Sequence, residues 1–280
     1  MVRVITLLLL LCVGLATPGF TQHKWTALET EADTLLNKQE FSAAVAKYSR
    51  VIAQQVKAKY SGPALTRYKR AVCFYYLQAF SKAIADLDIV IPANPNFYEA
   101  RLLRAFIYRE LGEDEKQLED INTILAVDPW NLNLLRWRAG IWMEAGEYER
   151  AQLDLLKVKE VQTDEEIELY LGLSWYYLDN PDEALNHFNT AIELNGGYAP
   201  AYQYAGILCI EQDAYALALS YIDLALRLEP ANTQLLFYKG IALVETGKTD
   251  EGCRLLNKAF YAGVDDAAGY LMEFCYKVDD

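Results

Sequence analysis

The chain has 280 residues and a formal net charge of −13, from 26 Lys and Arg against 39 Asp and Glu. Nucleic acids and anionic membrane surfaces are bound mainly through Lys and Arg, so this acidic balance argues against both as partners. An acidic surface that keeps the protein soluble, or that attracts a basic protein partner, agrees with the composition.

Residues 1–21 predict a secretory signal peptide. Arg3 precedes an apolar run over residues 4–16, and Thr17, Pro18 and Gly19 then break the helical pattern. The run is shorter than the ~20 residues that cross a bilayer, so an uncleaved anchor is the weaker interpretation. Lipid attachment at Cys12 is disfavoured because no small residue precedes it. Cleavage falls between residues 16 and 22, and the mature chain is expected to have no membrane span.

The rest of the chain repeats with a period of about 34 residues. Within each period an apolar helical pattern is interrupted and then resumes, as in 98–111 and 115–127, which are separated by Gly112 and followed by Pro129. Small residues recur twelve positions apart, with Gln117 as the one exception: Ala32/Ala44, Ala71/Ala83, Ala105/Gln117, Ala139/Ala151, Gly172/Ala184, Gly206/Ala218 and Gly240/Gly252. Each period therefore predicts a hairpin of two helices, and stacking of the hairpins predicts an all-α solenoid.

The small pairs are expected at the point where the two helices of a hairpin cross, because close crossing requires residues without bulk. Gln117 is expected to loosen the third hairpin. Larger residues four positions after each second member are expected to fill the space between neighbouring hairpins: Tyr48, Leu87, Ile121, Leu155, Phe188, Ile222 and Leu256.

This pattern resembles the tetratricopeptide repeat (TPR), most plainly at Leu171-Gly172, Trp175, Ala184, Phe188 and Ala191. The resemblance implies a right-handed α-solenoid of about seven TPR hairpins over residues 25–262, with starts near 25, 64, 98, 132, 165, 199 and 233. Residues 263–280 are expected to form a C-terminal capping helix and tail, with 267–277 as one amphipathic helix that covers the last hairpin.

The four cysteines that remain after signal cleavage are too sparse for a disulfide framework. Cys73 and Cys209 fall on inward positions of helices four repeats apart and are expected to be buried thiols. Cys253 and Cys275 fall on the last full helix and on the cap. A bridge between these two is a hypothesis that the sequence leaves open.

The first helices of such hairpins line a concave groove, and here the corresponding positions are largely aromatic and apolar from the second repeat onward. Tyr and Trp bury a large area at a small entropic cost and retain a polar group, which suits binding surfaces. Which tyrosines lie in the core and which in the groove stays open. The predicted partner-binding residues are Tyr68, Tyr75, Phe106, Arg109, Trp137, Met143, Tyr170, Tyr176, Tyr177, Tyr204, Phe237 and Tyr238.

Some members of the family grip the C-terminal carboxylate of chaperone tails with a clamp of Lys, Asn and Arg. The matching face of this chain carries Glu29, Asp33 and Asn37 without a cluster of cations, so a cytosolic co-chaperone role is disfavoured. Arg109 and Arg136 are interpreted as solvated partners of the nearby acidic residues Glu110 and Glu144. The groove is expected to take a peptide or a partner helix through apolar side chains.

No catalytic residue, metal site or cofactor site is expected, because His23 and His187 are the only histidines and His187 is expected on a polar helix surface. We therefore expect an exported, non-enzymatic scaffold for protein–protein interaction, in the periplasm or cell envelope, with a secreted or ER-lumenal protein as the alternative. Alternative functions are a glycan-binding module or a non-catalytic subunit of an envelope enzyme or assembly complex. The partner, its pathway and the oligomeric state are not determined by the sequence.

Overall fold

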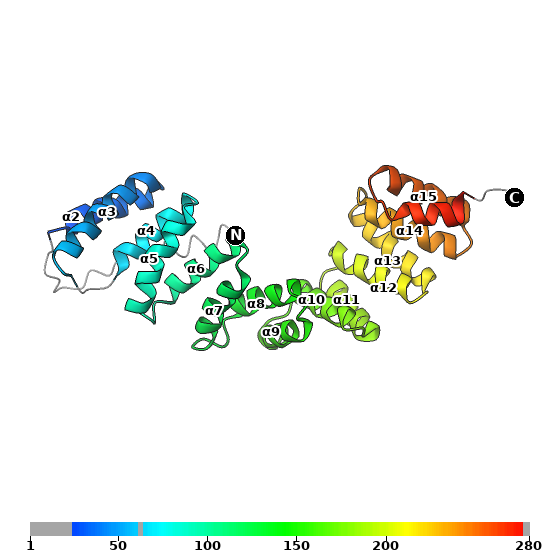
Figure 1. Cartoon of the computed structure of the whole chain (residues 1–280). Coiled ribbons are helices and arrows are strands. Elements are labelled where there is room, and N and C mark those ends of the chain that lie inside the picture. Colours follow the sequence, from blue (N-terminus) through cyan, green and yellow to red (C-terminus); the bar gives the residue numbers. More distant parts are fainter. Residues whose placement is uncertain (1–23, 61–63, 277–280) are drawn as a thin grey trace. The chain divides into compact units, whose positions relative to one another are not determined.

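A computed structural model describes residues 24–60 and 64–276, and every regular element in these ranges is a helix (Figure 1). The chain divides into two compact units, Met1–Pro129 and Trp130–Asp280. The predicted signal peptide over residues 1–21 lies outside the described residues. An all-α fold, as the sequence predicts, is confirmed.

The first unit is built from helices that pair in chain order as antiparallel hairpins. Each second helix packs against the first helix of its own hairpin and, within this unit, against the first helix of the next hairpin. The hairpins are α2 (Thr26–Asn37) with α3 (Phe41–Lys57), α4 (Leu65–Tyr76) with α5 (Phe80–Ala93), and α6 (Tyr98–Leu111) with α7 (Asp114–Leu125).

The second unit continues the same pattern and ends in a shorter segment. Its hairpins are α8 (Leu132–Glu144) with α9 (Tyr148–Val161), α10 (Glu165–Tyr177) with α11 (Pro181–Leu194), α12 (Ala199–Glu211) with α13 (Tyr215–Leu228), and α14 (Thr233–Glu245) with α15 (Thr249–Tyr261). The closing segment is α16 (Ala267–Tyr270), followed by the π-helix η1 (Leu271–Cys275).

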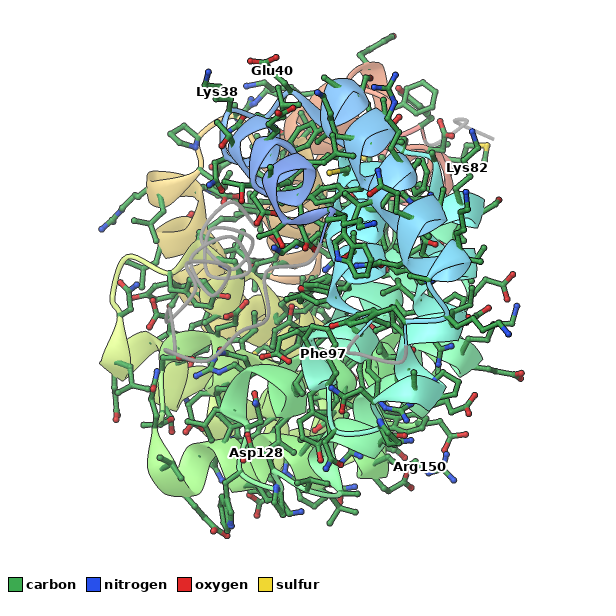
Figure 2. The ribbon with its side chains drawn as sticks, turned by 90° about the vertical axis from the view of Figure 1, so that its left-hand side faces the viewer. Lys38, Glu40, Lys82, Phe97, Asp128 and Arg150 are labelled. Atoms are coloured by element: carbon green, nitrogen blue, oxygen red, sulfur yellow. A yellow bond between two sulfur atoms is a disulfide. The ribbon has the colours of Figure 1, made fainter. Side chains whose placement is uncertain are left out.

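The turn inside each hairpin reverses the chain through one residue in the left-handed region. In α6/α7 this residue is Gly112, with φ of 68°, which costs a glycine little because it has no Cβ. In α2/α3 the residue is Gln39, with φ of 62°, and its sequence neighbours Lys38 and Glu40 are labelled in Figure 2. The same left-handed turn therefore forms with or without glycine.

Small residues sit at the helix crossings, as expected. A Cβ added to Gly172 would lie 2.5 Å from the Phe188 ring, and one added to Gly240 would lie 2.8 Å from Leu256. These contacts correct one detail of the prediction: the large residues pack onto the small residue of their own hairpin instead of only filling space between hairpins. The reason is that the gap left by the missing side chain opens toward the second helix of the same hairpin.

Gln117, which replaces the usual small residue of the third hairpin, is 1% exposed. Neither polar atom of its amide has a hydrogen-bond partner in the described part of the chain. A buried amide without partners costs about 1–3 kcal/mol of stability. The third hairpin is therefore the one whose crossing is chemically least favourable.

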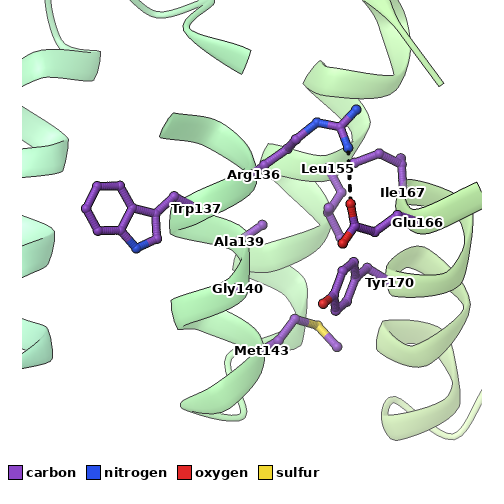
Figure 3. Close-up of a pocket in the computed structure, with 9 residues that line it drawn as sticks. All are labelled: Arg136, Trp137, Ala139, Gly140, Met143, Leu155, Glu166, Ile167 and Tyr170. Carbon is purple, nitrogen blue, oxygen red and sulfur yellow. Dashed lines mark ion pairs between the residues drawn. The ribbon is translucent and has the colours of Figure 1, made fainter. Parts of the chain in front are cut away.

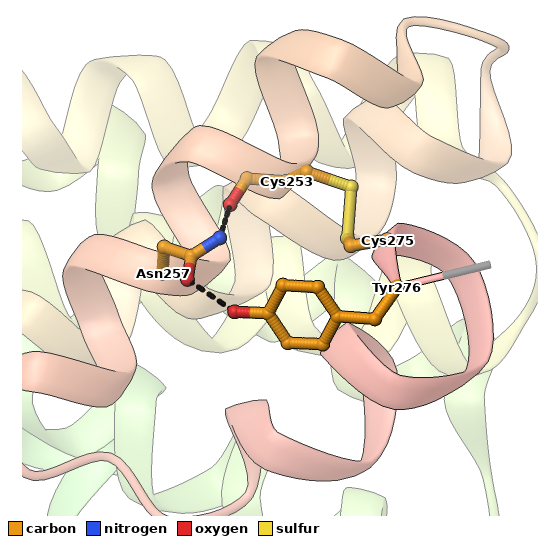
Figure 4. Close-up of a disulfide and its surroundings, with 4 residues drawn as sticks. All are labelled: Cys253, Asn257, Cys275 and Tyr276. Atoms are coloured by element: carbon orange, nitrogen blue, oxygen red, sulfur yellow. Dashed lines mark hydrogen bonds between the residues drawn. A yellow bond between two sulfur atoms is a disulfide. The ribbon is translucent and has the colours of Figure 1, made fainter. Parts of the chain in front are cut away.

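The last hairpin is covered by the closing segment. Val264, Ala267 and Leu271 are buried in one cluster with Leu256. Cys253 and Cys275 form a disulfide with their Cα atoms 5.7 Å apart, and the Tyr276 hydroxyl donates to Asn257 Oδ1 at 2.7 Å (Figure 4). The hypothesis of this bridge is confirmed.

The closing segment is not the single amphipathic α-helix expected over 267–277. After one α turn, the wider π-helix follows, in which the Tyr276 N–H donates to the Leu271 carbonyl at 2.9 Å. Such wide turns shift the helix face by one residue. The two remaining cysteines, Cys73 and Cys209, are buried free thiols, and burial raises the pKa of Cys73 to about 12.

Candidate binding site

Arginines on the first helices are held by buried aspartates, which is a feature that the sequence analysis missed. Each arginine directly precedes the small residue of its helix, and its partner lies 16 positions later on the second helix. Both carboxylate oxygens are engaged by two N–H donors at 2.7–2.9 Å. The pairs, called Arg–Asp clasps below, are Arg70–Asp86, Arg104–Asp120 and Arg138–Asp154. These guanidinium groups hold the two helices of their own hairpins together. The constant spacing of 16 residues between each arginine and its aspartate is the sequence signal that would have revealed the pairs.

In the first hairpin the polar face that was assigned to the groove instead packs against the next helix. Glu29 accepts a hydrogen bond from Thr66 at 2.6 Å. Asp33 accepts from Lys69 at 2.8 Å and from the Tyr48 hydroxyl at 2.7 Å. These acidic groups therefore join α2 to α4.

The predicted site residues of the first unit differ in burial. Tyr68 is 3% exposed, and its ring lies 4.7 Å from that of Phe97, so it belongs to the core. Tyr75 is half-buried, and burial raises its pKa. Phe106 is half-buried with the Arg109 guanidinium 5.2 Å from its ring centre, and Arg109 also pairs with Glu110 at 3.2 Å.

A pocket of about 230 Å³ opens between α8 and α10 in the second unit (Figure 3). Met143 and Tyr170 converge on it from the two helices, while the Trp137 indole turns away from them. We call it the Gly140 pocket; its lining is Arg136, Trp137, Ala139, Gly140, Met143, Leu155, Glu166, Ile167 and Tyr170. Two residues predicted from the sequence, Met143 and Tyr170, are thus brought together, and a third, Trp137, lines the pocket with its indole turned away.

The polar edge of the pocket is organised by Asp164. Its carboxylate caps α10 by accepting from the Ile167 N–H at 2.9 Å and accepts from Arg136 at 2.7 Å. Burial works to raise the pKa of Asp164, but the Arg136 and backbone hydrogen bonds outweigh it and leave the pKa lowered. Arg136 also lies 3.9 Å from Glu166. The expected pairing of Arg136 with Glu144 is therefore wrong, because Asp164 offers the closer carboxylate.

Four tyrosines of α10 and α12, namely Tyr170, Tyr176, Tyr177 and Tyr204, form what we call the tyrosine face. The Tyr177 ring is 53% exposed and stacks on Tyr148 with centroids 4.8 Å apart. The Tyr176 hydroxyl donates to Glu211 at 2.6 Å, and burial together with this hydrogen bond raises the pKa of Tyr176. Tyr204 is half-buried against Phe188.

The last two predicted residues lie near the closing segment. Phe237 is 6% exposed, with its ring 6.0 Å from Tyr270, and belongs to the core. Tyr238 is half-buried next to it. The burial of Phe237 follows from the closing segment, which covers the α14 face that the repeat pattern alone leaves open.

Glu168 is a buried acid that the sequence analysis did not single out. Its carboxylate accepts from Lys159 at 2.8 Å and from Thr163 at 3.0 Å, and it lies 2.7 Å from His187 Nδ1. His187 is therefore not simply on a polar surface as expected. Burial works to raise the pKa of Glu168, but these three partners outweigh it and leave the pKa lowered. The cluster ties α9, α10 and α11 together and does not line the pocket.

The acidic charge is carried by the second unit. Residues 1–129 hold 15 Lys and Arg and 14 Asp and Glu, whereas residues 130–280 hold 11 and 25, a formal charge of −14. Among the described residues, no group of three His, Cys, Asp or Glu could hold a metal ion. No described helix is long and apolar enough to cross a membrane.

Comparison with solved structures identifies the fold. The C-terminal part of a TPR protein from Cytophaga hutchinsonii matches with a TM-score of 0.68 and 16% identity over 87% of this chain and 99% of that one. YrrB, described as a TPR protein with an unusual peptide-binding site, matches with a TM-score of 0.55 and 17% identity over 66% and 97%. This chain has the TPR fold.

A third match to the TPR hairpins is PilW, described as a widely conserved type IV pilus biogenesis factor, with a TM-score of 0.59 and 13% identity over 74% of this chain and 98% of that one. No family model matches the sequence, and no curated protein matches it significantly. At these identities the likeness establishes the TPR fold.

Proposed function

We propose that this protein is an exported, non-catalytic scaffold that binds a peptide or a partner helix through the tyrosine face and the adjoining Gly140 pocket. The proposal rests on the observation that exposed aromatic rings lie beside a pocket formed by neighbouring first helices. Tyr170 belongs to both. Exposed aromatic rings next to a concave apolar pocket are typical of protein-binding sites.

Tyr68 and Phe237 are left out of this surface because their rings are buried. Tyr177 is its most exposed ring, and its stacking on Tyr148 fixes its orientation before any partner arrives. A rigid ring loses little entropy on binding, which favours its use as an anchor. A scaffold role agrees with the structural likeness to YrrB, whose description names a peptide-binding site.

Export is supported by two observations on this chain. Residues 1–21 have the pattern of a secretory leader. The chain contains the Cys253–Cys275 disulfide. Disulfides persist in oxidising compartments and are rare in the reducing cytosol. We place the protein in the periplasm or cell envelope, and likeness to a pilus biogenesis factor agrees with that location.

A site-specific photo-crosslinker tests the binding surface. Replacing Tyr177 with p-benzoylphenylalanine should produce a crosslink to one defined partner segment in the native cell envelope. The same replacement at Tyr261, which is 83% exposed on α15, provides the control. Equal crosslinking at both positions, or none at Tyr177, would contradict the proposed surface.

Fractionation of cells that produce the full chain tests export. The mature protein should lack its leader by N-terminal mass spectrometry and should carry the Cys253–Cys275 bridge in its unreduced peptide map. A full-length, fully reduced protein in the cytosolic fraction would contradict export.

A further inference from the structure

The Gly140 pocket exists because one repeat lacks a side chain that the others have. The position directly after the first small residue is apolar and bulky in the other hairpins from the second onward. It is occupied by Val72, Phe106, Leu173, Ile207 and Ile241, of which Val72, Leu173 and Ile241 are buried. In α8 the same position is Gly140, and the space is open.

Packing does not require a glycine at this position. A Cβ added to Gly140 would meet no atom within 4 Å, whereas one added to Gly172 would collide with Phe188. A glycine inside a helix costs about 1 kcal/mol relative to alanine. Gly140 therefore destabilises α8 without being required by packing in its own hairpin. The missing side chain leaves the space that forms the pocket.

The lining of the pocket combines an apolar interior with an acidic edge. Met143, Leu155, Ile167 and the Tyr170 ring provide the interior. At the edge, Arg136 is already held by Asp164 at 2.7 Å, and Glu166, 59% exposed, lies 3.9 Å from it. The two carboxylates exceed the single guanidinium by one negative charge.

Further negative charge surrounds this site. Burial raises the pKa of Tyr170, and Glu166 and Glu144, the last residue of α8, add to this effect. Helix α8 has no basic residue in its last turn, although cations are favoured at helix C-termini. By contrast, the second helix α9 carries Lys159 in its last turn. The C-terminal end of α8 is thus left negative, within a unit of charge −14.

We propose that the Gly140 pocket receives the side chain of an arginine or lysine from an extended segment of the partner. This inference rests on the proposed peptide-binding function and specifies its chemistry. The aliphatic stem lies against Met143 and Tyr170, and the cation reaches Glu166 at the edge. Long cationic side chains bury an apolar stem while their head stays with polar groups, which matches this combination of interior and edge.

Methyl NMR of the full chain can detect occupancy of the pocket directly. The sequence has three methionines: Met1 in the predicted leader, Met143 in the pocket, and Met272 on η1, which is exposed. Methionine labelled with 13C at its methyl group therefore gives Met143 as the reporter and Met272 as the internal control, besides the Met1 signal. The probes are acetyl-Gly-Gly-Arg-Gly-Gly-amide and matched peptides with citrulline or leucine at the centre.

The arginine peptide should shift the Met143 methyl signal and leave that of Met272 in place. Citrulline keeps the size of arginine and removes its charge, so its affinity should be about tenfold weaker. Glu166→Gln should weaken the arginine peptide and leave the leucine peptide unchanged. Gly140→Leu should abolish the Met143 shift while circular dichroism and the Tm show an intact fold.

Each contrary result has its own meaning. If the leucine peptide binds as tightly as the arginine peptide, the cationic assignment is wrong. If no peptide shifts Met143, or if Gly140→Leu does not alter the shift, the pocket is not the binding element. Should these outcomes occur while the crosslink at Tyr177 persists, the proposed function stands and only this inference falls.

Discussion

The Arg104 guanidinium holds the Asp120 carboxylate through two hydrogen bonds of 2.8 and 2.9 Å, and the Asp120 side chain has no exposed surface. Arg101 adds a third donor to the same carboxylate at 3.4 Å. The paired geometry raises the pKa of Arg104. Because the clasp joins the two helices of one hairpin, it fixes how they are rotated against each other.

Removing one member of this clasp should be costly. Asp120→Ala leaves the guanidinium without its buried partner, and we expect a loss of about 3–5 kcal/mol in the free energy of unfolding, measured by urea denaturation. Asp88 also pairs with Arg104, at 2.6 Å, but is 52% exposed and is the matched control. Asp88→Ala should cost about 1 kcal/mol or less. Similar losses for both variants would show that the clasp is not a main support of the hairpin.

Two glycines should respond in opposite directions to the same change. Gly172→Ala places a methyl group 2.5 Å from the Phe188 ring, so we expect about 1–3 kcal/mol of destabilisation. Gly140→Ala meets open space in a helix interior and should stabilise by about 0.5–1 kcal/mol. Thermal unfolding of both variants measures the difference. A stabilising Gly172→Ala would contradict the close crossing of α10 and α11.

The Glu168 cluster should make stability depend on pH. The pKa of Glu168 is lowered in the folded protein, so its contribution is complete above the unfolded value of 4.5 and is lost as the pH falls through the folded pKa. Unfolding free energies of the wild type should therefore decline below about pH 5 more steeply than those of Glu168→Gln. Glu193→Gln, on an exposed position of α11, controls for the loss of one charge. Parallel profiles for the wild type and Glu168→Gln would rule out this linkage.

The Cys253–Cys275 bridge closes a loop with a sequence separation of 22. A loop of this size is worth about 3 kcal/mol through the reduced entropy of the unfolded chain. Reduction should lower the Tm of the wild type and speed amide exchange in residues 264–276, because the bridge ties this segment to α15. The double variant Cys253→Ser/Cys275→Ser should start at the lower Tm and show no further change with reductant. A reductant effect on that variant would point to another cause.

Much of the fold was accessible from the sequence because its determinants are local. The helical period, the turn at Gly112 and the small residue at Gly172 act within one hairpin of contiguous residues, and they correctly predicted an all-α TPR arrangement. The cysteine positions allowed the Cys253–Cys275 bridge as a hypothesis for the same reason. Gln117 was recognised as a departure, although its unpaired amide could not be seen.

The site depended on contacts between hairpins, which the sequence does not specify residue by residue. The repeat pattern placed Tyr68, Tyr177 and Phe237 on equivalent faces, yet only Tyr177 is exposed, because burial is set by what the next hairpin or the closing segment places over each ring. In the sequence, nothing distinguishes Gly140 from the other glycines. Only the packed helices show that no side chain fills the space beside it. The repeated hairpin is encoded locally, by short-range periodicity and sterics. The buried ion pairs, the exposed rings and the pocket follow from the tertiary structure, since they depend on which side chains face each other once the helices pack within and between hairpins.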